Sequence, residues 1–169
     1  MKKMFACILA LCLLAAWAAP GLAAGNLPAF ADRMLYKNLL GELDMLGVAV
    51  DLNEPLVYSS TSVEPHKIYI AMPAEDITFG IVYENGIAIG YTLYAPAYDD
   101  LKSVYSMMAF ARTFFDNTME DAKGTISDLL AGGEEDEDGN SVYRIFTDDA
   151  TYEYGFVDGS VVLSYLPNP

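Results

Sequence analysis

"ITFGIVYENGIAIGYTLY" (residues 77–94) decides the fold, because it predicts two β-strands joined by a tight turn at Asn85-Gly86. Asn-Gly suits a type I′ turn, since both central residues of that turn need a positive φ. An ordinary surface hairpin alternates apolar and polar residues, so that one face meets the core and the other meets water. This hairpin is apolar on both faces, so the sequence predicts that something covers its second face.

A second hairpin with a similar pattern follows 73 residues later. Residues 148–166 (DDATYEYGFVDGSVVLSYL) align without a gap on residues 75–93 (EDITFGIVYENGIAIGYTL), and the turn Asp158-Gly159 falls on Asn85-Gly86. The second hairpin is aromatic on one face and polar or small on the other. Its aromatic face is therefore the expected core face.

Helical periodicity precedes each hairpin. Residues 27–46 repeat apolar side chains at the spacing of one helix face, and a second helical region begins at Asp99, a good N-cap. This order predicts an α+β fold, with helices packed on one side of antiparallel β-sheet, in two tandem helix-plus-β-hairpin halves of about 73 residues, 25–96 and 97–169. The core positions expected in the first helix are Phe30, Met34, Leu35, Leu39, Leu43 and Leu46.

A two-residue turn also fixes which side chains of the first hairpin share a face. The predicted pairs on the core face are Tyr83–Ala88, Ile81–Gly90 and Phe79–Thr92. We expect the second face either to be covered by another part of the same chain or to bind a partner or ligand. That face would carry Val82, Ile87, Ile89, Tyr91 and Leu93.

The first 26 residues have the three-part pattern of a secretory signal peptide. Two lysines precede the apolar run from Met4 to Ala19, and small residues follow Pro20-Gly21. As a helix this run rises about 24 Å, which is short of the ~30 Å hydrocarbon core that a stable membrane anchor must cross. We therefore expect residues 1–24 to be cleaved and residues 25–169 to form a single exported domain, periplasmic or extracellular.

The expected mature chain contains no cysteine, because Cys7 and Cys12 both lie in the leader. It would hold no disulfide, thiol nucleophile or thiolate metal site, and it would depend on packing alone. All 24 acidic residues remain against seven Lys and Arg, which gives a formal charge of −17. Such a charge argues against nucleic acid as a partner and leaves proteins, small ligands and cations.

Catalytic motifs are scarce. His66 is the only histidine, in a segment expected to be a loop, and the GxSxG and HExxH motifs are absent. Carboxylate pairs could in principle hydrolyse a glycoside, although such pairs usually mark turns and helix caps. These pairs are Glu75-Asp76, Asp99-Asp100 and Asp148-Asp149. The sequence names no catalytic residue, and a non-enzymatic role is favoured.

The acidic run EEDEDGN (residues 134–140) is the sharpest local motif. Glu134, Asp136 and Asp138 alternate before a glycine, which resembles the start of an EF-hand calcium loop. Ile145 stands where the twelfth-position acid should be, and the residues that follow the loop predict a strand instead of a helix. A weak calcium site at these three acids is an alternative to a solvated acidic loop, and no other cofactor is indicated.

These observations together predict an exported, non-enzymatic binding domain that holds a protein partner or a small ligand on an apolar sheet face. In architecture alone, it resembles small secreted inhibitor proteins of tandem helix–sheet repeats, which bind enzymes on a concave sheet. No residue motif carries this resemblance, so it implies neither a partner nor site residues. The alternatives are a carboxylate-based hydrolase and an acidic calcium-binding module.

Overall fold

A computed structural model describes residues 27–59, 62, 65–96, 101–116, 122–124, 126–127, 134–135, 141–157 and 160–168. None of the described helices is long and apolar enough to cross a membrane. The helical elements are α2 (Phe30–Met45), α3 (Leu101–Ala111) and the π-helical turn η1 (Arg112–Asp116). The strands are β1 (Val57–Tyr58), β2 (His66–Ala74), β3 (Ile77–Glu84), β4 (Ile87–Ala95), β5 (Glu134–Glu135), β6 (Ser141–Phe146), β7 (Ala150–Val157) and β8 (Ser160–Pro167).

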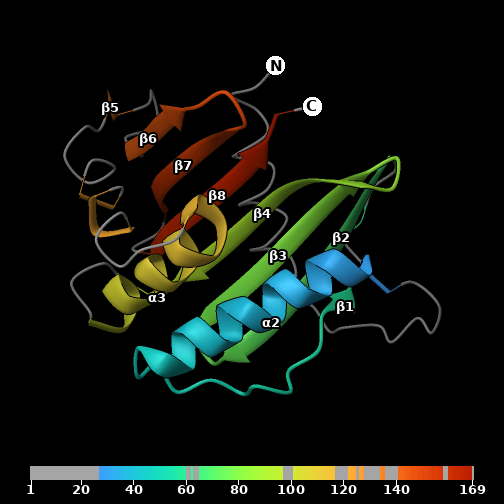
Figure 1. Ribbon diagram of the computed structural model, residues 1–169, viewed down its shortest axis with the longest axis horizontal. Coiled ribbons are helices and arrows are strands. Elements are labelled where there is room, and N and C mark those ends of the chain that lie inside the picture. Colours follow the sequence, from blue (N-terminus) through green and yellow to red (C-terminus); the bar gives the residue numbers. More distant parts are fainter. Residues whose placement is uncertain are drawn as a thin grey trace.

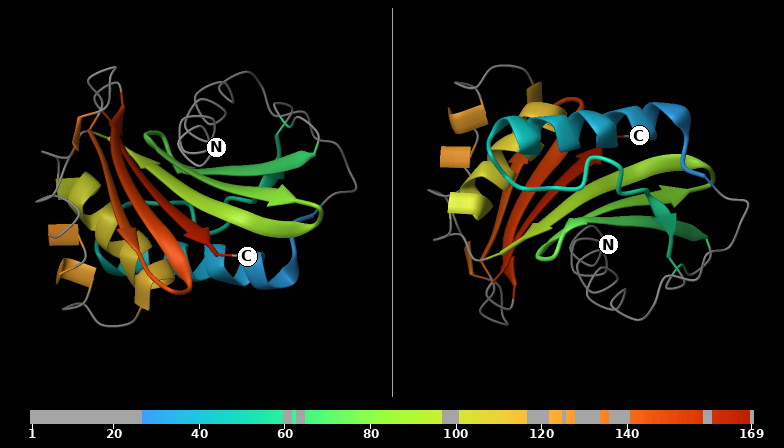
Figure 2. Two further views of the ribbon diagram at one scale, coloured as in Figure 1. Left: turned by 90° about the horizontal axis from the view of Figure 1, so that it is seen from above. Right: turned by 90° about the horizontal axis from the view of Figure 1, so that it is seen from below.

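One antiparallel sheet contains all of these strands, in the order β1-β2-β3-β4-β8-β7-β6-β5. Strands β1–β4 and β5–β8 form two groups that meet where β4 pairs with β8, with Leu93 opposite Leu163. Figure 1 shows α2 and α3 in front of the sheet, and the two views of Figure 2 place both helices on the same side of it. The predicted α+β class is confirmed.

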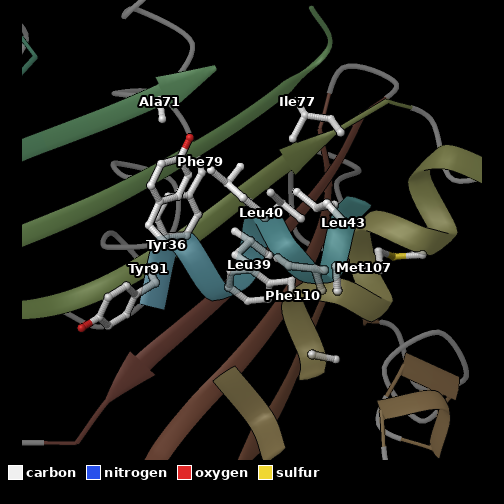
Figure 3. Close-up of a cluster of buried hydrophobic side chains, with 14 of the residues drawn as sticks. Tyr36, Leu39, Leu40, Leu43, Ala71, Ile77, Phe79, Tyr91, Met107 and Phe110 are labelled. Atoms are coloured by element: carbon white, nitrogen blue, oxygen red, sulfur yellow. The ribbon is translucent and has the colours of Figure 1, made fainter. Parts of the chain in front are cut away.

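The main core fills the space between the helices and the sheet (Figure 3). Phe79 on β3 stacks on Tyr36 of α2, with ring centroids 5.2 Å apart, and Ile81 on the same strand is fully buried. This confirms the core face that was expected for β3. The largest helical side chains in this core are Tyr36, Leu39, Leu40 and Leu43 from α2 and Met107 and Phe110 from α3.

The hairpin of β3 and β4 turns as its sequence predicts. Asn85 and Gly86 both have positive φ angles, 52° and 83°, which the type I′ turn requires. Tyr83 pairs with Ala88 as expected. Up to this point the predicted register is correct.

Beyond this pair, one extra residue in β4 changes the register. Val82 pairs with Gly90, so Ile89 is a β-bulge without a partner on β3. A bulge of one residue moves every later side chain of its strand to the opposite face. The predicted pairs Ile81–Gly90 and Phe79–Thr92 are therefore wrong, and the observed pairs are Ile81–Tyr91 and Phe79–Leu93.

Helix α2 is also rotated relative to the prediction. Phe30 and Met34, which were expected in the core, are 70% and 42% exposed. Leu39 and Leu43 are buried as expected, and Leu40 joins them. The cause lies in the first turn of the helix, where a buried carboxylate is bound to the sheet, as the next section describes.

We expect Leu39→Ala to lower the free energy of unfolding by about 2–5 kcal/mol, because it removes buried methyl groups and leaves a cavity. Met45→Ala on the same helix is the control, since Met45 is 60% exposed. Its truncation should change this free energy by less than about 0.5 kcal/mol. Urea denaturation followed by circular dichroism measures both values, and equal values would contradict the packing of α2 on the sheet.

Candidate functional site

The sheet face opposite α2 and α3 is the first candidate site, and we call it the helix-free face because none of the described helices packs on it. Side chains alternate along a strand, so its members are the residues that lie between the core residues of each strand. Its apolar members include Ile68 and Ile70 on β2, Val82 on β3, Ile87, Ile89 and Tyr94 on β4, Val162 and Leu166 on β8 and Phe146 on β6. Its polar members include Thr92, Ser164, Glu153 and Arg144.

The apolar end of this face lies on β2, β3 and the start of β4. Ile68, Ile70 and Val82 form a second buried cluster, 4%, 7% and 5% exposed, and Ile89 packs against it. Ile87, beside the hairpin turn, is 70% exposed. The structure therefore brings Val82 and Ile89 together, but the described residues do not show what covers the cluster.

Tyr91 and Leu93 do not belong to this face, although the sequence assigned them to it. They are 6% and 1% exposed and lie in the core beneath the helices. The reason is the bulge at Ile89, which turns both side chains toward α2 and α3. Their predicted position on this face is wrong, and the partner-binding role of the other residues stays a prediction.

The middle of the helix-free face is polar and internally bonded. The hydroxyl oxygens of Thr92 and Ser164, both buried, lie 3.2 Å apart across the pairing of β4 with β8. On the neighbouring strands, Arg144 donates a hydrogen bond from Nε to Glu153 Oε1 at 2.5 Å. Glu153 is 5% exposed, so its charge is neutralised in place. These bonds hold the polar side chains of the face in fixed positions.

A buried carboxylate is the main polar feature on the helix side of the sheet. Asp32, in the first turn of α2, is 7% exposed and accepts hydrogen bonds from the hydroxyl groups of Tyr83 and Tyr91. The distance from Tyr91 Oη to Asp32 Oδ1 is 2.6 Å. The Tyr83 hydroxyl oxygen in turn accepts a hydrogen bond from the backbone N–H of Ala29 at 3.1 Å. Four positions are thus connected across two strands and the start of a helix.

The two phenols are held in their protonated form. Burial raises the pKa of Tyr83 and of Tyr91, and the hydrogen bond that each donates to Asp32 raises it further. Neutral tyrosines can donate the hydrogen bonds that a buried carboxylate needs. The two phenols therefore stabilise the charge of Asp32, for which no ion pair is found among the described residues. We interpret the cluster as a structural attachment of α2 to the sheet. Sequence reasoning missed it, because it requires Tyr91 on the core face.

The remaining predicted site residues are dispersed. Glu134 lies in β5, opposite Val142, whereas Asp136 and Asp138 lie outside the described residues. Residues 141–146 form β6, a strand where an EF-hand has its second helix. Within the described part of the chain, no group of three or more His, Cys, Asp or Glu side chains could hold a metal ion. The proposed calcium site stays a prediction.

His66 and the carboxylate pairs form no shared site in the described residues. His66 was expected in a loop but begins β2, and its Nε2 lies 3.7 Å from Glu84 Oε1. Asp76 forms an ion pair with Lys102. The pair Asp148-Asp149 is exposed in the β6–β7 turn, and Asp99-Asp100 lies outside the described residues.

Comparison of the chain with protein-family models, with curated proteins and with solved structures finds no match. In the part of the chain that the structure describes, the fold is an α+β domain whose single sheet has helices on one face and none on the other. The function is therefore inferred from the geometry of these faces.

We expect Tyr91→Phe to lower the free energy of unfolding by about 1.5–3 kcal/mol, because it removes a hydrogen bond to a buried charged group. Tyr94→Phe is the matched control, since Tyr94 is half-buried on the same strand and outside this cluster. Its effect should be less than about 0.5 kcal/mol. Urea denaturation distinguishes the two, and a neutral Tyr91→Phe would mean that Asp32 does not depend on this donor.

We also expect the folded protein to lose stability above about pH 10, where tyrosines of an unfolded chain ionise. Tyr36, Tyr83 and Tyr91 have raised pKa values in the folded state, chiefly through burial. Above this pH the unfolded state binds fewer protons than the folded state, so the free energy of unfolding falls as pH rises. The tyrosinate absorbance should therefore rise in two stages, the second coinciding with loss of circular dichroism. One smooth titration of an intact fold would contradict this.

Proposed function

We propose that this protein is an exported, non-enzymatic binding domain that holds a protein partner on its helix-free face. One observation carries the proposal: the described helices cover one side of an eight-stranded sheet, and among the described residues no element outside the sheet packs on the other side. Two apolar side chains of this face, Ile87 and Phe146, are strongly exposed, and exposed apolar surface supports an interaction role.

The exposed apolar residues of this face support a partner of some size. Ile87 and Phe146 are each 70% exposed and come from β4 and β6, with β8 and β7 lying between these two strands. The hydrogen-bonded pair of Thr92, on β4 itself, and Ser164, on β8, lies on the same face. A fixed polar centre with apolar residues around it suits a protein surface, whereas a small ligand requires a concave pocket.

The charge of the chain indicates the character of the partner. The formal charge is −15, and the exposed pair Asp148-Asp149 follows Phe146 closely in the β6–β7 turn. Opposite potentials attract two proteins before contact and select the partner, so we expect basic residues around the apolar contact. The same charge disfavours nucleic acid.

Export and an internal repeat complete the proposal. The leader pattern in residues 1–24 supports export, with residues 25–169 as the mature domain.

The internal repeat rests on the arrangement of the strands. The sheet order supports two related halves, because β1–β4 run in order inward from one edge and β5–β8 run in order inward from the other. Thr92 and Ser164 pair with each other at the junction of the halves. Only the first hairpin has the bulge, since β7 and β8 pair without a shift.

Site-specific photo-crosslinking in the native host tests this function. A photoreactive phenylalanine analogue placed at Ile87 or at Phe146 should yield a discrete heavier adduct with a partner protein. Met45 and Leu101 on α2 and α3 are the control positions, since they are 60% and 69% exposed on the helix side. The analogue there should yield no such adduct, because the helix side would not contact the partner.

The pattern of adducts decides the outcome. An adduct shared by the two positions on the helix-free face and absent from the two helix positions supports the proposal. Equal adducts at all four positions, or none at Ile87 and Phe146, would mean that the helix-free face does not hold a protein partner.

A further inference from the structure

A second candidate site lies on the opposite side of the molecule, in an open hollow of about 330 Å³ between α2 and the π-helical turn η1. The two helical elements that form it cover the other face of the sheet, so the hollow is separate from the helix-free face (Figure 2). Its lining is mainly polar. The residues are Lys37, Asn38, Gly41 and Glu42 from α2 and Arg112 and Thr113 from η1.

Gly41 is the first sign that the hollow receives a ligand. It lies in the interior of α2, where glycine destabilises a helix relative to alanine. The fold does not require it, because a Cβ at Gly41 would meet no atom within 4 Å and its φ angle is not positive. The missing side chain therefore leaves the α2 backbone accessible from the hollow. Glycine commonly occupies positions where a ligand approaches the backbone closely.

Arg112 is the second sign. It begins η1, and π-helical turns inside helices are rare and occur frequently at functional sites. Its Nη1 lies 2.8 Å from Glu42 Oε2, and the Arg112 side chain is 20% exposed. Its Nε is buried and has no hydrogen-bond partner among the described residues. A guanidinium carries five N–H donors, so the contact with Glu42 holds Arg112 in place and leaves donors for another acceptor.

The charge of the hollow differs from that of the chain as a whole. Lys37 is exposed, and no described carboxylate forms an ion pair with it. Lys37 and Arg112 together outweigh the single carboxylate of Glu42, whereas the whole chain has a formal charge of −15. An anion in the hollow would thus lie close to two cationic side chains, although the protein as a whole is acidic.

From these observations we propose that the hollow binds an anionic oxygen group, a carboxylate or a phosphate. Lys37 and Arg112 supply the charge, Asn38 adds an amide donor, and Gly41 lets the group lie against the backbone of α2. Glu42 is a positioning residue that orients the guanidinium. The group can come from a free small anion or from an acidic side chain on a peptide, and the two sources share this chemistry.

Nuclear magnetic resonance titrations of the mature domain test the proposal, with inorganic phosphate, acetate and a glutamate-rich peptide as separate probes. We expect saturable shifts of the backbone amides of Gly41 and Arg112. Saturation by phosphate or acetate would show that a free anion suffices, and saturation by the peptide alone would assign the group to a peptide side chain. No saturable shift with any probe would overturn the proposal.

Gly41→Ala separates binding from structure. We expect the variant to melt about 2–4 °C higher, because alanine favours the helix and its Cβ has space. The same variant should bind the active probe about tenfold or more weakly, since the Cβ occupies the place of the ligand. A variant that melts higher and binds like the parent would overturn the proposal.

Charge variants provide the matched comparison. Lys37→Gln should weaken binding about tenfold or more, through loss of a charge-assisted hydrogen bond. Lys123→Gln removes the same charge at an exposed position outside the hollow and should leave binding unchanged. Equal weakening by the two variants would mean that the probe responds to net charge alone, which would also overturn the proposal.

Discussion

The attachment of Asp32 to two tyrosines is the interaction on which the packing of α2 depends, and it exists because β4 contains one extra residue. The bulge at Ile89 puts Tyr91 on the same face as Tyr83, and only then do both hydroxyl groups reach the carboxylate. A buried carboxylate with a single hydrogen-bond donor would destabilise the fold, whereas two neutral donors satisfy its hydrogen-bonding needs. The local irregularity of one strand thus determines how the neighbouring helix is rotated.

Much of the fold follows from local sequence. The Asn85-Gly86 turn, the alternation of Phe79, Ile81 and Tyr83, and the strand at residues 141–146 were all predictable, because each depends on neighbours in the chain. The register of β4 was not predictable from the turn alone. A glycine within a strand can mark a bulge, and Gly90 follows Ile89 directly, but the same residue also fits an unbroken strand.

The helix phase was harder to predict, because apolar spacing favours one face and the structure uses another. Phe30 and Met34 continue the apolar stripe of Leu39 and Leu43, so periodicity assigns them to the core. Burial of Asp32 turns the first part of α2 and exposes both residues. Such an error is expected wherever a polar residue is buried by partners that are distant in sequence. The hollow beside Gly41 was not predictable for a related reason, since Lys37 and Arg112 are 75 positions apart in the sequence.

The two proposed surfaces lie on opposite sides of one sheet and use different chemistry. The helix-free face offers apolar contacts around a bonded polar centre, and the hollow between α2 and η1 offers positive charge in an acidic molecule. Occupants of the two would not compete for space, because the sheet and its core separate them. The domain could therefore hold a protein on one side while an anionic group is bound on the other.

The position of β8 has a consequence for how the chain acquires this structure. It is the last strand along the chain, yet it lies between β4 and β7 and joins the two groups of strands. The pairing of Leu93 with Leu163 spans 70 residues, and loops of such length close slowly. Until residues 160–167 have been synthesised, β4 has no neighbour on that side and remains an open edge. Completion of the sheet must therefore come late, after most of the chain has been synthesised.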